Sequence, residues 1–353
     1  MAKRNIVVIG ASAGGFEAIK TLVSSLPADL DAAIFIVWHM SPDVSGVMPQ
    51  VLNRYHTIPA ANAIDGESVA FNRIYVAPPD RHMILEDGVI RLTRGPKENR
   101  FRPAVDPLFR SVAFQYKSRV IGIILSGALD DGTSGLWMVK HRGGIAIVQD
   151  PDDAAVPSMP ENALRAVSAD YCVPINKIGE LMTKLTQEEA GEVDELGIEE
   201  NDRIAFELSM TTGGHFDEEG ISSLGSPSCY ACPECHGVLF KIREGNSLRY
   251  RCHTGHAYSA DTLLASISEN IEDALWSAIR SVEESIMLLN GFGDHYAAKN
   301  EPKIAAAYFK KAHEAANRNE WVRQAVLSHD RLSSDKINEA SGISQKGSKF
   351  QYF

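Results

Sequence analysis

Short apolar runs alternate with amphipathic stretches over about the first 185 residues of this 353-residue chain. Apolar positions in the intervening stretches recur at helical spacing, as in Phe16–Leu26 and Leu108–Tyr116. This alternation of strands and helices predicts an α/β fold, a doubly wound parallel sheet with helices on both faces. The apolar runs that we expect to form its strands are Asn5–Ile9, Ala32–Trp38, Arg73–Ala77, Val120–Leu125 and Gly144–Gln149.

The pattern changes at residue 187. Acidic residues dominate from 187 to 227 with almost no basic residues among them, and Gly213-Gly214 and Gly225-Ser-Pro227 interrupt any long periodicity. We predict a flexible acidic linker here. It is either a solvated spacer or a strip that covers a basic surface as a lid.

Helical spacing returns after Ser259, which is expected to be the N-cap of a long helix. A second helix is predicted over about Pro302–Ser328, with the turn of an antiparallel hairpin at Gly291-Phe-Gly293. The apolar stripe is either hairpin core or a surface for a homodimer or another partner. The stripe of the first helix comprises Leu264, Ile267, Ile271, Leu275, Ile279, Val282 and Ile286.

These changes in pattern divide the chain into five predicted parts. They are an α/β domain (1–186), the acidic linker (187–227), a small cysteine-rich unit (228–258), the helical hairpin (259–330) and a polar tail (331–353).

Composition narrows the class of protein. Apolar residues make up 44% of the chain, enough for a sizeable core. The longest apolar run, Ala32–Trp38, is too short to cross a bilayer, and the first residues lead into a strand rather than a signal peptide. We therefore expect a cytoplasmic protein without membrane insertion. The formal net charge of −11 argues against nucleic acid as the main partner.

The first predicted strand runs into Gly10-Ala-Ser12-Ala-Gly14-Gly15, which places a serine between a strand and a helix. A dinucleotide-binding loop would have glycine at Ser12 and an acidic residue where His39 stands. Lipase-like hydrolases also have G-x-S-x-G, but several strands precede their serine. The remaining alternatives are a nucleophile of another kind and a plain turn.

Ser12, His39 and Asp130 or Asp131 each follow a different predicted strand. The carboxyl ends of parallel strands meet at the crevice where ligands bind. Serine, histidine and aspartate are the residues for acyl transfer, as nucleophile, base and support of the histidine. We therefore predict a serine hydrolase, with either Asp130 or Asp131 as the acid.

Several ordered stretches carry a resemblance over about residues 1–185. They are Gly10–Gly15, Trp38-His39-Met40, Tyr75-Val-Ala-Pro-Pro-Asp-Arg-His82, Arg100-Phe-Arg-Pro-Ala-Val-Asp106, Gly127-Ala-Leu-Asp-Asp131-Gly132 and Met159-Pro160. In this order they resemble the chemotaxis protein-glutamate methylesterases, the CheB family. The resemblance implies a parallel-sheet serine hydrolase that removes methyl esters from glutamates of chemoreceptor helices, and in many members deamidates receptor glutamines.

The resemblance also assigns roles to residues. It implies Ser12, His39 and Asp131 as the triad, and a backbone oxyanion donor at Ala128. From the mechanism we also expect backbone amides at the start of the helix after Ser12, such as that of Ala13, to face the oxyanion. No cofactor is needed for this reaction. Arg100 and Arg102 either steer an acidic receptor helix or are solvated surface charges.

Two features depart from the family's pattern. The usual enzyme carries an N-terminal receiver domain, whereas here the catalytic strand begins near Met1, so we expect no control by a receiver. The family commonly has glycine where Leu129 stands and a non-acidic residue where Asp130 stands.

Four of the five cysteines lie between Cys229 and Cys252, whereas Cys172 stands alone. Such a cluster in a reducing compartment favours a metal site over disulfides. We predict a zinc ribbon with a hairpin formed by Val238–Ile242 and Leu248–Arg251, and a closed ligand set that makes the zinc structural. The predicted ligands are Cys232, Cys235, Cys252 and His256, with Cys229 and His253 as alternates.

Basic residues of this unit leave nucleic-acid binding as an alternative role for it. They are Lys241, Arg243, Arg249 and Arg251.

For the whole chain, the sequence predicts a stand-alone protein-glutamate methylesterase with a zinc-ribbon and helical tail. The alternatives are an esterase of the same family acting on another carboxyl ester, and a zinc-dependent signalling scaffold whose triad is vestigial.

Overall fold

The computed structural model describes residues 2–40, 46–193, 195–213, 218–245, 247–333 and 336–337. The chain forms two compact units, residues 1–263 and residues 264–353. In the described ranges, none of the helices combines the length and the apolar character needed to cross a membrane.

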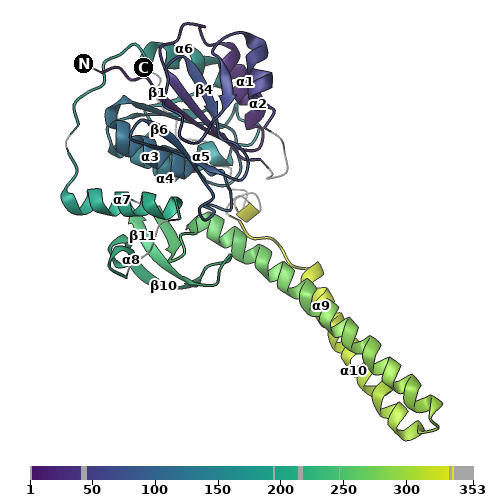
Figure 1. Cartoon of the computed structure of the whole chain (residues 1–353). Coiled ribbons are helices and arrows are strands. Elements are labelled where there is room, and N and C mark those ends of the chain that lie inside the picture. Colours follow the sequence, from purple (N-terminus) through teal and green to yellow (C-terminus); the bar gives the residue numbers. More distant parts are fainter. Residues whose placement is uncertain are drawn as a thin grey trace. The chain divides into compact units, whose positions relative to one another are not determined.

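The first unit is built on a seven-stranded sheet in the order β3-β4-β2-β1-β7-β8-β9, with all neighbouring strands parallel (Figure 1). The predicted α/β fold is confirmed. The edge strands β3 and β9 were not among the predicted strands because each has only three residues. The strands are β1 (Ile6–Ala11), β2 (Ala33–Trp38), β3 (Ala60–Asn62), β4 (Arg73–Val76), β7 (Val120–Ile124), β8 (Ile145–Gln149) and β9 (Tyr171–Val173).

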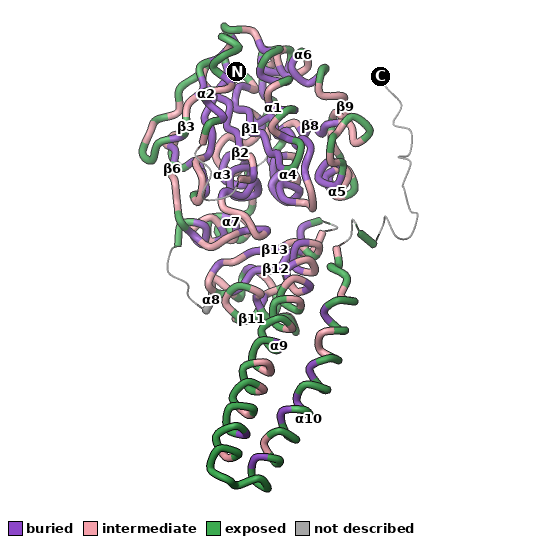
Figure 2. The backbone as a smooth tube through the Cα atoms, turned by 90° about the vertical axis from the view of Figure 1, so that its right-hand side faces the viewer, coloured by how far each residue is buried: buried purple, intermediate pink, exposed green. Residues whose placement is uncertain are grey.

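The central strand β1 pairs with β2 on one side and β7 on the other. These three strands are buried almost throughout, because helices cover both faces of the sheet. Figure 2 shows this burial for β1 and β2. Burial on both faces explains why each strand reads as a continuous apolar run rather than an alternating one. The strand order reverses between β1 and β7, the position where such sheets open a crevice.

Two separate apolar cores fill the space between the sheet and its helices. One core includes Ile19, Leu52 and Met182 from the helices α1, α2 and α6, and the other includes Phe109, Leu136 and Ala163 from α3, α4 and α5. The helices are α1 (Gly15–Ser24), α2 (Met48–Leu52), α3 (Val105–Tyr116), α4 (Thr133–His141), α5 (Ser158–Ala166) and α6 (Ile175–Leu185).

A β-hairpin of β5 (His82–Glu86) and β6 (Val89–Thr93) lies outside the main sheet. It packs on α3, where the Leu85 amide donates a hydrogen bond of 3.1 Å to Ser111 Oγ. This pair was not among the predicted strands.

The predicted flexible linker is wrong in part, because its range contains helices α7 (Ile198–Thr211) and α8 (Glu218–Leu224). Helix α7 buries Ile204 and Met210 together with the charged Glu207. The acidic composition concealed this, because Glu207 meets arginines that lie far away in sequence. Asp194 and Asp217 of the predicted linker lie outside the described residues.

A second sheet, here called the C-terminal sheet, comprises the antiparallel strands β10 (Ser226–Ala231), β11 (Val238–Glu244), β12 (Ser247–Cys252) and β13 (Ala257–Ser259). The predicted hairpin corresponds to β11 and β12 and is confirmed. The sheet is not a separate domain as predicted, since it lies in the same compact unit as the parallel sheet.

Residues 264–353 form the second unit, which consists mainly of two long helices running antiparallel (Figure 1). They are most of α9 (Ala260–Ala298) and all of α10 (Pro302–Leu327). The N-cap is confirmed, because Ser259 Oγ accepts a hydrogen bond of 2.9 Å from the Thr262 amide. The predicted homodimer through these helices stays a prediction.

The predicted turn at Gly291–Gly293 is wrong, because α9 continues through both glycines. Glycine at 293 serves close helix packing instead, since a Cβ there would lie 2.5 Å from the ring of Phe309 on α10. The chain turns at Asn300, whose φ is 62°, and Pro302 begins α10. Most of the predicted polar tail lies outside the described residues.

Candidate active site

Ser12 follows the last residue of β1 and lies in a tight turn before α1. Its amide donates to the Ser126 carbonyl (3.0 Å), and its carbonyl accepts from the Gly15 amide (2.9 Å). Gly14 has φ 73°, and a Cβ there would lie 2.6 Å from that of Ala155. The turn that places Ser12 just before the first residue of α1 therefore requires a glycine at position 14.

His39 follows β2, the strand paired with β1. Its amide donates to the Ala11 carbonyl at 3.1 Å, so the sheet register itself places the histidine beside Ser12. Trp38 Nε1 donates to the Ser12 carbonyl at 2.9 Å and anchors the end of the strand to the serine turn.

The structure brings Ser12, His39 and Asp131 into one chain of hydrogen bonds. His39 Nδ1 lies 3.1 Å from Ser12 Oγ, and His39 Nε2 lies 2.7 Å from Asp131 Oδ2. With the proton on Nε2 donated to the carboxylate, Nδ1 is free to accept the Ser12 hydroxyl proton. This is the arrangement that a general base requires, and all three residues are at most 9% exposed.

Of the two aspartates predicted as alternatives, Asp131 and not Asp130 contacts His39, while its role as the catalytic acid stays a prediction. Asp130 instead accepts a hydrogen bond of 2.7 Å from the hydroxyl of Ser259. Leu129, where the family commonly has glycine, adopts φ 63° in the left-handed region.

Asp131 is held as an anion by several donors. Besides His39, its carboxylate accepts from the Val105 amide (2.6 Å), the Gly132 amide (3.0 Å) and Asn99 Nδ2 (2.8 Å). Burial alone would raise the pKa of Asp131, but His39 and these donors hold it below its ordinary value. A negative Asp131 fixes the orientation of His39 and supports the cation that forms during proton transfer.

A second buried carboxyl group, that of Asp106, lies beside the first. Asn99 Nδ2 donates to Asp106 Oδ2 at 2.7 Å, so one amide group connects both aspartates. Burial and the negative charge of Asp131 raise the pKa of Asp106 well above its ordinary value. The two opposite shifts make the aspartate that faces His39 the more acidic member of the pair.

Asn99 and the structural role of Asp106 were missed by sequence reasoning. Asp106 lies in one of the stretches that carry the family resemblance, which was the available signal. Asn99 directly precedes that stretch, and nothing in its local pattern marks it.

Phe101 covers the histidine. The two rings stack at 3.7 Å between centroids with an interplanar angle of 11°. Phe101 thereby keeps the imidazole flat against one wall of the site and limits the access of water to it.

A cavity of about 530 Å³ opens over Ser12 and His39. Lys97, Arg100 and Arg102 line it together with Asp80, so cations outnumber anions among its charged residues. Hydrogen bonds from Arg94 and Arg102 lower the pKa of Asp80 to about 2. The two arginines proposed to steer substrate thus lie at the cavity, while steering itself stays a prediction.

Ala13 also lines the cavity, and Ala128 lies two residues beyond Ser126, whose carbonyl pairs with the Ser12 amide. Within the described part of the chain, neither the Ala13 amide nor the Ala128 amide donates to a backbone carbonyl. Their role as oxyanion donors stays a prediction.

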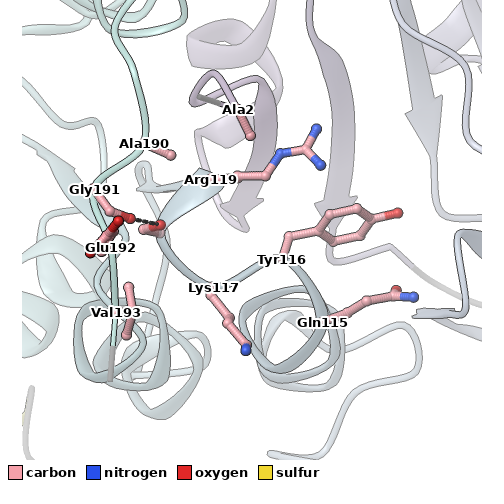
Figure 3. A pocket seen from close by; sticks show the side chains of 10 residues that line it. Ala2, Gln115, Tyr116, Lys117, Arg119, Ala190, Gly191, Glu192 and Val193 are labelled. Carbon is pink, nitrogen blue, oxygen red and sulfur yellow. Dashed lines mark hydrogen bonds between the residues drawn. The ribbon is translucent and has the colours of Figure 1, made fainter. Parts of the chain in front are cut away.

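A second cavity, of about 450 Å³, lies at the opposite, amino-terminal edge of the sheet (Figure 3). Residues 115–119 line it with Ala2 and residues 190–193, and Ser118 Oγ donates to the Gly191 carbonyl at 2.6 Å. Among the described residues of its lining, no nucleophile is hydrogen-bonded to a base, in contrast to Ser12 and His39 at the first cavity.

Apart from this site, the four predicted metal ligands lie together. The ligand atoms of Cys232, Cys235, Cys252 and His256 are all within 4.8 Å of one another. Neither alternate, the exposed Cys229 nor His253, belongs to this group in the described residues. Two of the four basic residues that suggested nucleic-acid binding by the C-terminal sheet are not exposed for it. Arg249 and Arg251 are buried and paired with glutamates.

Comparison with known proteins matches residues 7–182 to the family model of the CheB methylesterases. A Leptospira interrogans protein named as a candidate protein-glutamate methylesterase/protein-glutamine glutaminase is 38% identical over 182 residues, which cover 51% of this chain and 94% of that protein.

Two further matches agree with the first. A Methanosarcina acetivorans protein-glutamate methylesterase/protein-glutamine glutaminase is 36% identical over 52% of this chain and 54% of its own length, so this chain spans about half of that relative. The crystal structure of the Thermotoga maritima CheB methylesterase catalytic domain superposes with a TM-score of 0.50 at 35% identity, over 52% of this chain and 99% of that domain. All three matches cover about half of the present chain.

Proposed function

We propose, from the premise that this chain belongs to the CheB methylesterase family, that it is a protein-glutamate methylesterase that works through Ser12, His39 and Asp131. The observation that carries the proposal is the chain of hydrogen bonds from Ser12 Oγ through both ring nitrogens of His39 to Asp131. It connects a nucleophile, a base and a buried anion at the carboxyl edge of three adjacent strands.

In the first half of the reaction, Ser12 Oγ attacks the carbonyl carbon of a glutamate γ-methyl ester. His39 Nδ1 takes the hydroxyl proton, and Asp131 stabilises the imidazolium through Nε2. The amides of Ala13 and Ala128 are the proposed donors to the tetrahedral oxyanion. Collapse of this intermediate transfers the proton from His39 to the leaving oxygen, which departs as methanol.

In the second half, water takes the place of methanol. His39 removes a proton from this water, which attacks the acyl-serine carbonyl, and Ser12 leaves with the proton returned by His39. The products are the receptor with an unesterified glutamate side chain and the regenerated enzyme. The same steps on a glutamine side chain release ammonia, the second reaction in the names of the relatives.

The charge of the cavity suits this substrate class. Lys97, Arg100 and Arg102 surround a site whose substrate would be a glutamate-rich receptor helix. We propose that these cations attract such helices at their methylated positions. A substrate on the cytoplasmic part of chemoreceptors places the enzyme in the cytoplasm.

The test is methanol release from membranes that carry methylated chemoreceptors. Ser12→Ala should lower the rate by at least about 10³-fold, because removal of the nucleophile leaves only residual stabilisation of the transition state. Ser24→Ala, at an exposed serine of the adjacent helix α1, is the matched control and should release methanol at the wild-type rate.

Methanol release by Ser12→Ala at the control rate would refute the catalytic assignment. Absence of release from the intact chain, together with Ser12-dependent hydrolysis of p-nitrophenyl acetate, would refute the substrate and favour another carboxyl ester. Inactivity toward both would favour the scaffold.

A further inference from the structure

The spacing of the four clustered side chains suits a tetrahedral zinc ion. Zinc bonds of about 2.3 Å to sulfur and about 2.0 Å to nitrogen give ligand separations of about 3.8 Å between two sulfurs and about 3.5 Å between sulfur and nitrogen. Cys235 Sγ and Cys252 Sγ are 3.6 Å apart, and Cys252 Sγ lies 3.6 Å from His256 Nδ1.

The surroundings of the cluster fit bound thiolates. The hydroxyl of Thr254 lies 3.0 Å from Cys235 Sγ and 2.9 Å from Cys252 Sγ, within reach to donate to a metal-bound sulfur. The Tyr258 hydroxyl lies 3.6 Å from Cys232 Sγ. Four protein ligands leave no open position, so the ion would be structural.

The last ligand, His256, is followed directly by the strand β13, and this strand contacts the active site. The Asn99 amide donates to the Ala257 carbonyl at 2.8 Å, and the Ala257 amide donates to the Lys97 carbonyl at 3.3 Å. Lys97 also pairs with Glu234 at 3.2 Å, between Cys232 and Cys235 in sequence. The segment 97–101 is therefore held along the edge of the C-terminal sheet.

The side chain of Asn99 contacts both the end of the C-terminal sheet and the aspartates beside His39. Its side-chain oxygen accepts from the Ser259 amide (2.9 Å) and from the Thr262 hydroxyl (3.1 Å). Its side-chain nitrogen donates to Asp131 and Asp106. A single buried amide thus joins the end of β13 to the acid of the proposed triad.

The backbone of this segment is strained. Asn99 has φ 49° and Arg100 has φ 76°, in the left-handed region that non-glycine residues avoid. Such conformations persist only where surrounding contacts enforce them. The contacts that enforce them here include those from Ala257 and Ser259, while Phe101, one residue further, stacks on His39.

A second connection reaches the opposite wall of the site. Ser259 Oγ donates to Asp130, which precedes the catalytic aspartate in the loop that also holds Ala128. Asp130 is one of the two positions at which this chain differs from the family's usual pattern. The residue that departs from the family's pattern is thus the one that contacts Ser259 of the C-terminal sheet.

We propose that Cys232, Cys235, Cys252 and His256 bind one structural Zn²⁺, and that this ion, through the C-terminal sheet, holds Asn99 and the segment 97–101 in the position that catalysis requires. Asn99 is the positioning residue that connects the two sites. The metal part of this proposal stands by itself, while the catalytic part rests on the proposed function of Ser12.

The metal is tested on the full chain by elemental analysis. We expect one zinc per chain in the wild type and in Cys229→Ser, whose cysteine is exposed and outside the cluster. Cys252→Ser should lose most of the zinc. Wild-type protein without stoichiometric zinc, or full retention by Cys252→Ser, would overturn the site.

The connection is tested by the rate at which a fluorophosphonate labels Ser12, because this rate reports activation of the serine whatever the natural ester is. Chelation of zinc from the wild type should slow labelling at least tenfold, and readdition of zinc should restore the rate. This reversible experiment does not depend on whether Cys252→Ser folds. Labelling that is equally fast with and without zinc would overturn the connection.

Asn99→Ala separates positioning from mere support. It should keep its zinc, label slowly, shift the pH profile of labelling because Asp131 has lost a donor, and respond to chelation less than threefold. A full additional tenfold loss on chelation would show that zinc acts by another route and would overturn the role of Asn99. If the fluorophosphonate labels Ser12 at the normal rate but no methanol is released from receptors, the proposed substrate is refuted. The labelling experiments still test the role of zinc and Asn99 in that case.

Discussion

The two larger sheets of the first unit are held in place by different forces. The parallel sheet lies between two large apolar cores. The C-terminal sheet has few fully buried apolar side chains, among them Leu239 and Ile242, and docks through buried charges instead. Apolar burial supplies stability without direction, whereas paired charges define one geometry of contact. The difference gives a physical basis for the proposal that the small sheet holds Asn99 and its neighbours in place beside Asp131.

The docking charges are three arginines and three glutamates. Arg249 contacts Glu207 (2.7 Å) and Glu244 (2.8 Å), and Arg251 contacts Glu98 (2.8 Å) and Glu207 (3.1 Å). Arg110 of α3 contacts Glu98 at 3.1 Å. Strand β12, helix α7 and the active-site segment thus meet in one buried network.

The largest effect on this network is expected from Arg249→Met. The substitution leaves Glu207 and Glu244 without a main partner in a buried position, which should lower the free energy of unfolding by about 3–5 kcal/mol. Urea unfolding measures this change. Arg243→Met, at an exposed arginine of β11, is the control and should change stability by less than about 0.5 kcal/mol. Equal effects of the two variants would show that the network does not hold the sheet.

Acid should weaken the docking of the C-terminal sheet more than the apolar cores. Burial alone would raise the pKa of Glu98, but Arg110 and Arg251 lower it to about 2 from an ordinary 4.5. Because the folded pKa is the lower one, the ionised glutamate stabilises the fold above about pH 4.5, and this contribution is lost as pH falls toward 2. The full contribution is on the order of 3 kcal/mol.

Urea unfolding of the wild type and of Glu98→Gln at pH 7, 5 and 4 measures the contribution of ionised Glu98 to the free energy of unfolding. The variant should lose less stability than the wild type between pH 7 and 4, because it has no carboxylate to protonate. Glu86→Gln, at an exposed glutamate of β5, should follow the wild type. Identical pH dependence of wild type and Glu98→Gln would contradict the assignment.

The smallest effect concerns the loop that Ser259 contacts. Leu129 is held at φ 63°, which costs an L-residue roughly 1–2 kcal/mol and glycine almost nothing. Leu129→Gly should therefore raise the free energy of unfolding, measured by urea unfolding, by up to about 1 kcal/mol. This figure allows for the larger conformational entropy that glycine gives the unfolded chain. Leu129→Ala is the matched control, since it shortens the side chain but keeps the strain. A glycine variant no more stable than the alanine variant would refute the strain.

Much of the parallel sheet and the proposed triad could be predicted from sequence because both depend on local patterns. Continuous apolar runs identify strands buried on two faces, and the residue after each run lies at the carboxyl edge. That reasoning placed Ser12 and His39 correctly, but it left Asp130 and Asp131 as alternatives. Adjacent residues of one loop are distinguished only by the direction in which the loop turns.

Other errors have a similar cause. The acidic stretch after residue 187 looked solvated because the arginines that pair with Glu207 lie outside it in the sequence. They are Arg110, Arg249 and Arg251. The glycines at 291 and 293 looked like a turn because the ring that packs on Gly293 belongs to Phe309 on another helix.

The sequence by itself determined the α/β architecture, the strand ends that carry Ser12, His39 and an aspartate, and the grouping of the cysteines, because all three follow from spacing along the chain. Only the tertiary structure decided that Asp131 is the aspartate facing His39, and that Asn99 links it to residues 257–262. The physical reason is that a buried amide or carboxyl group takes its role from the partners that folding brings to it, and these lie up to 163 residues away.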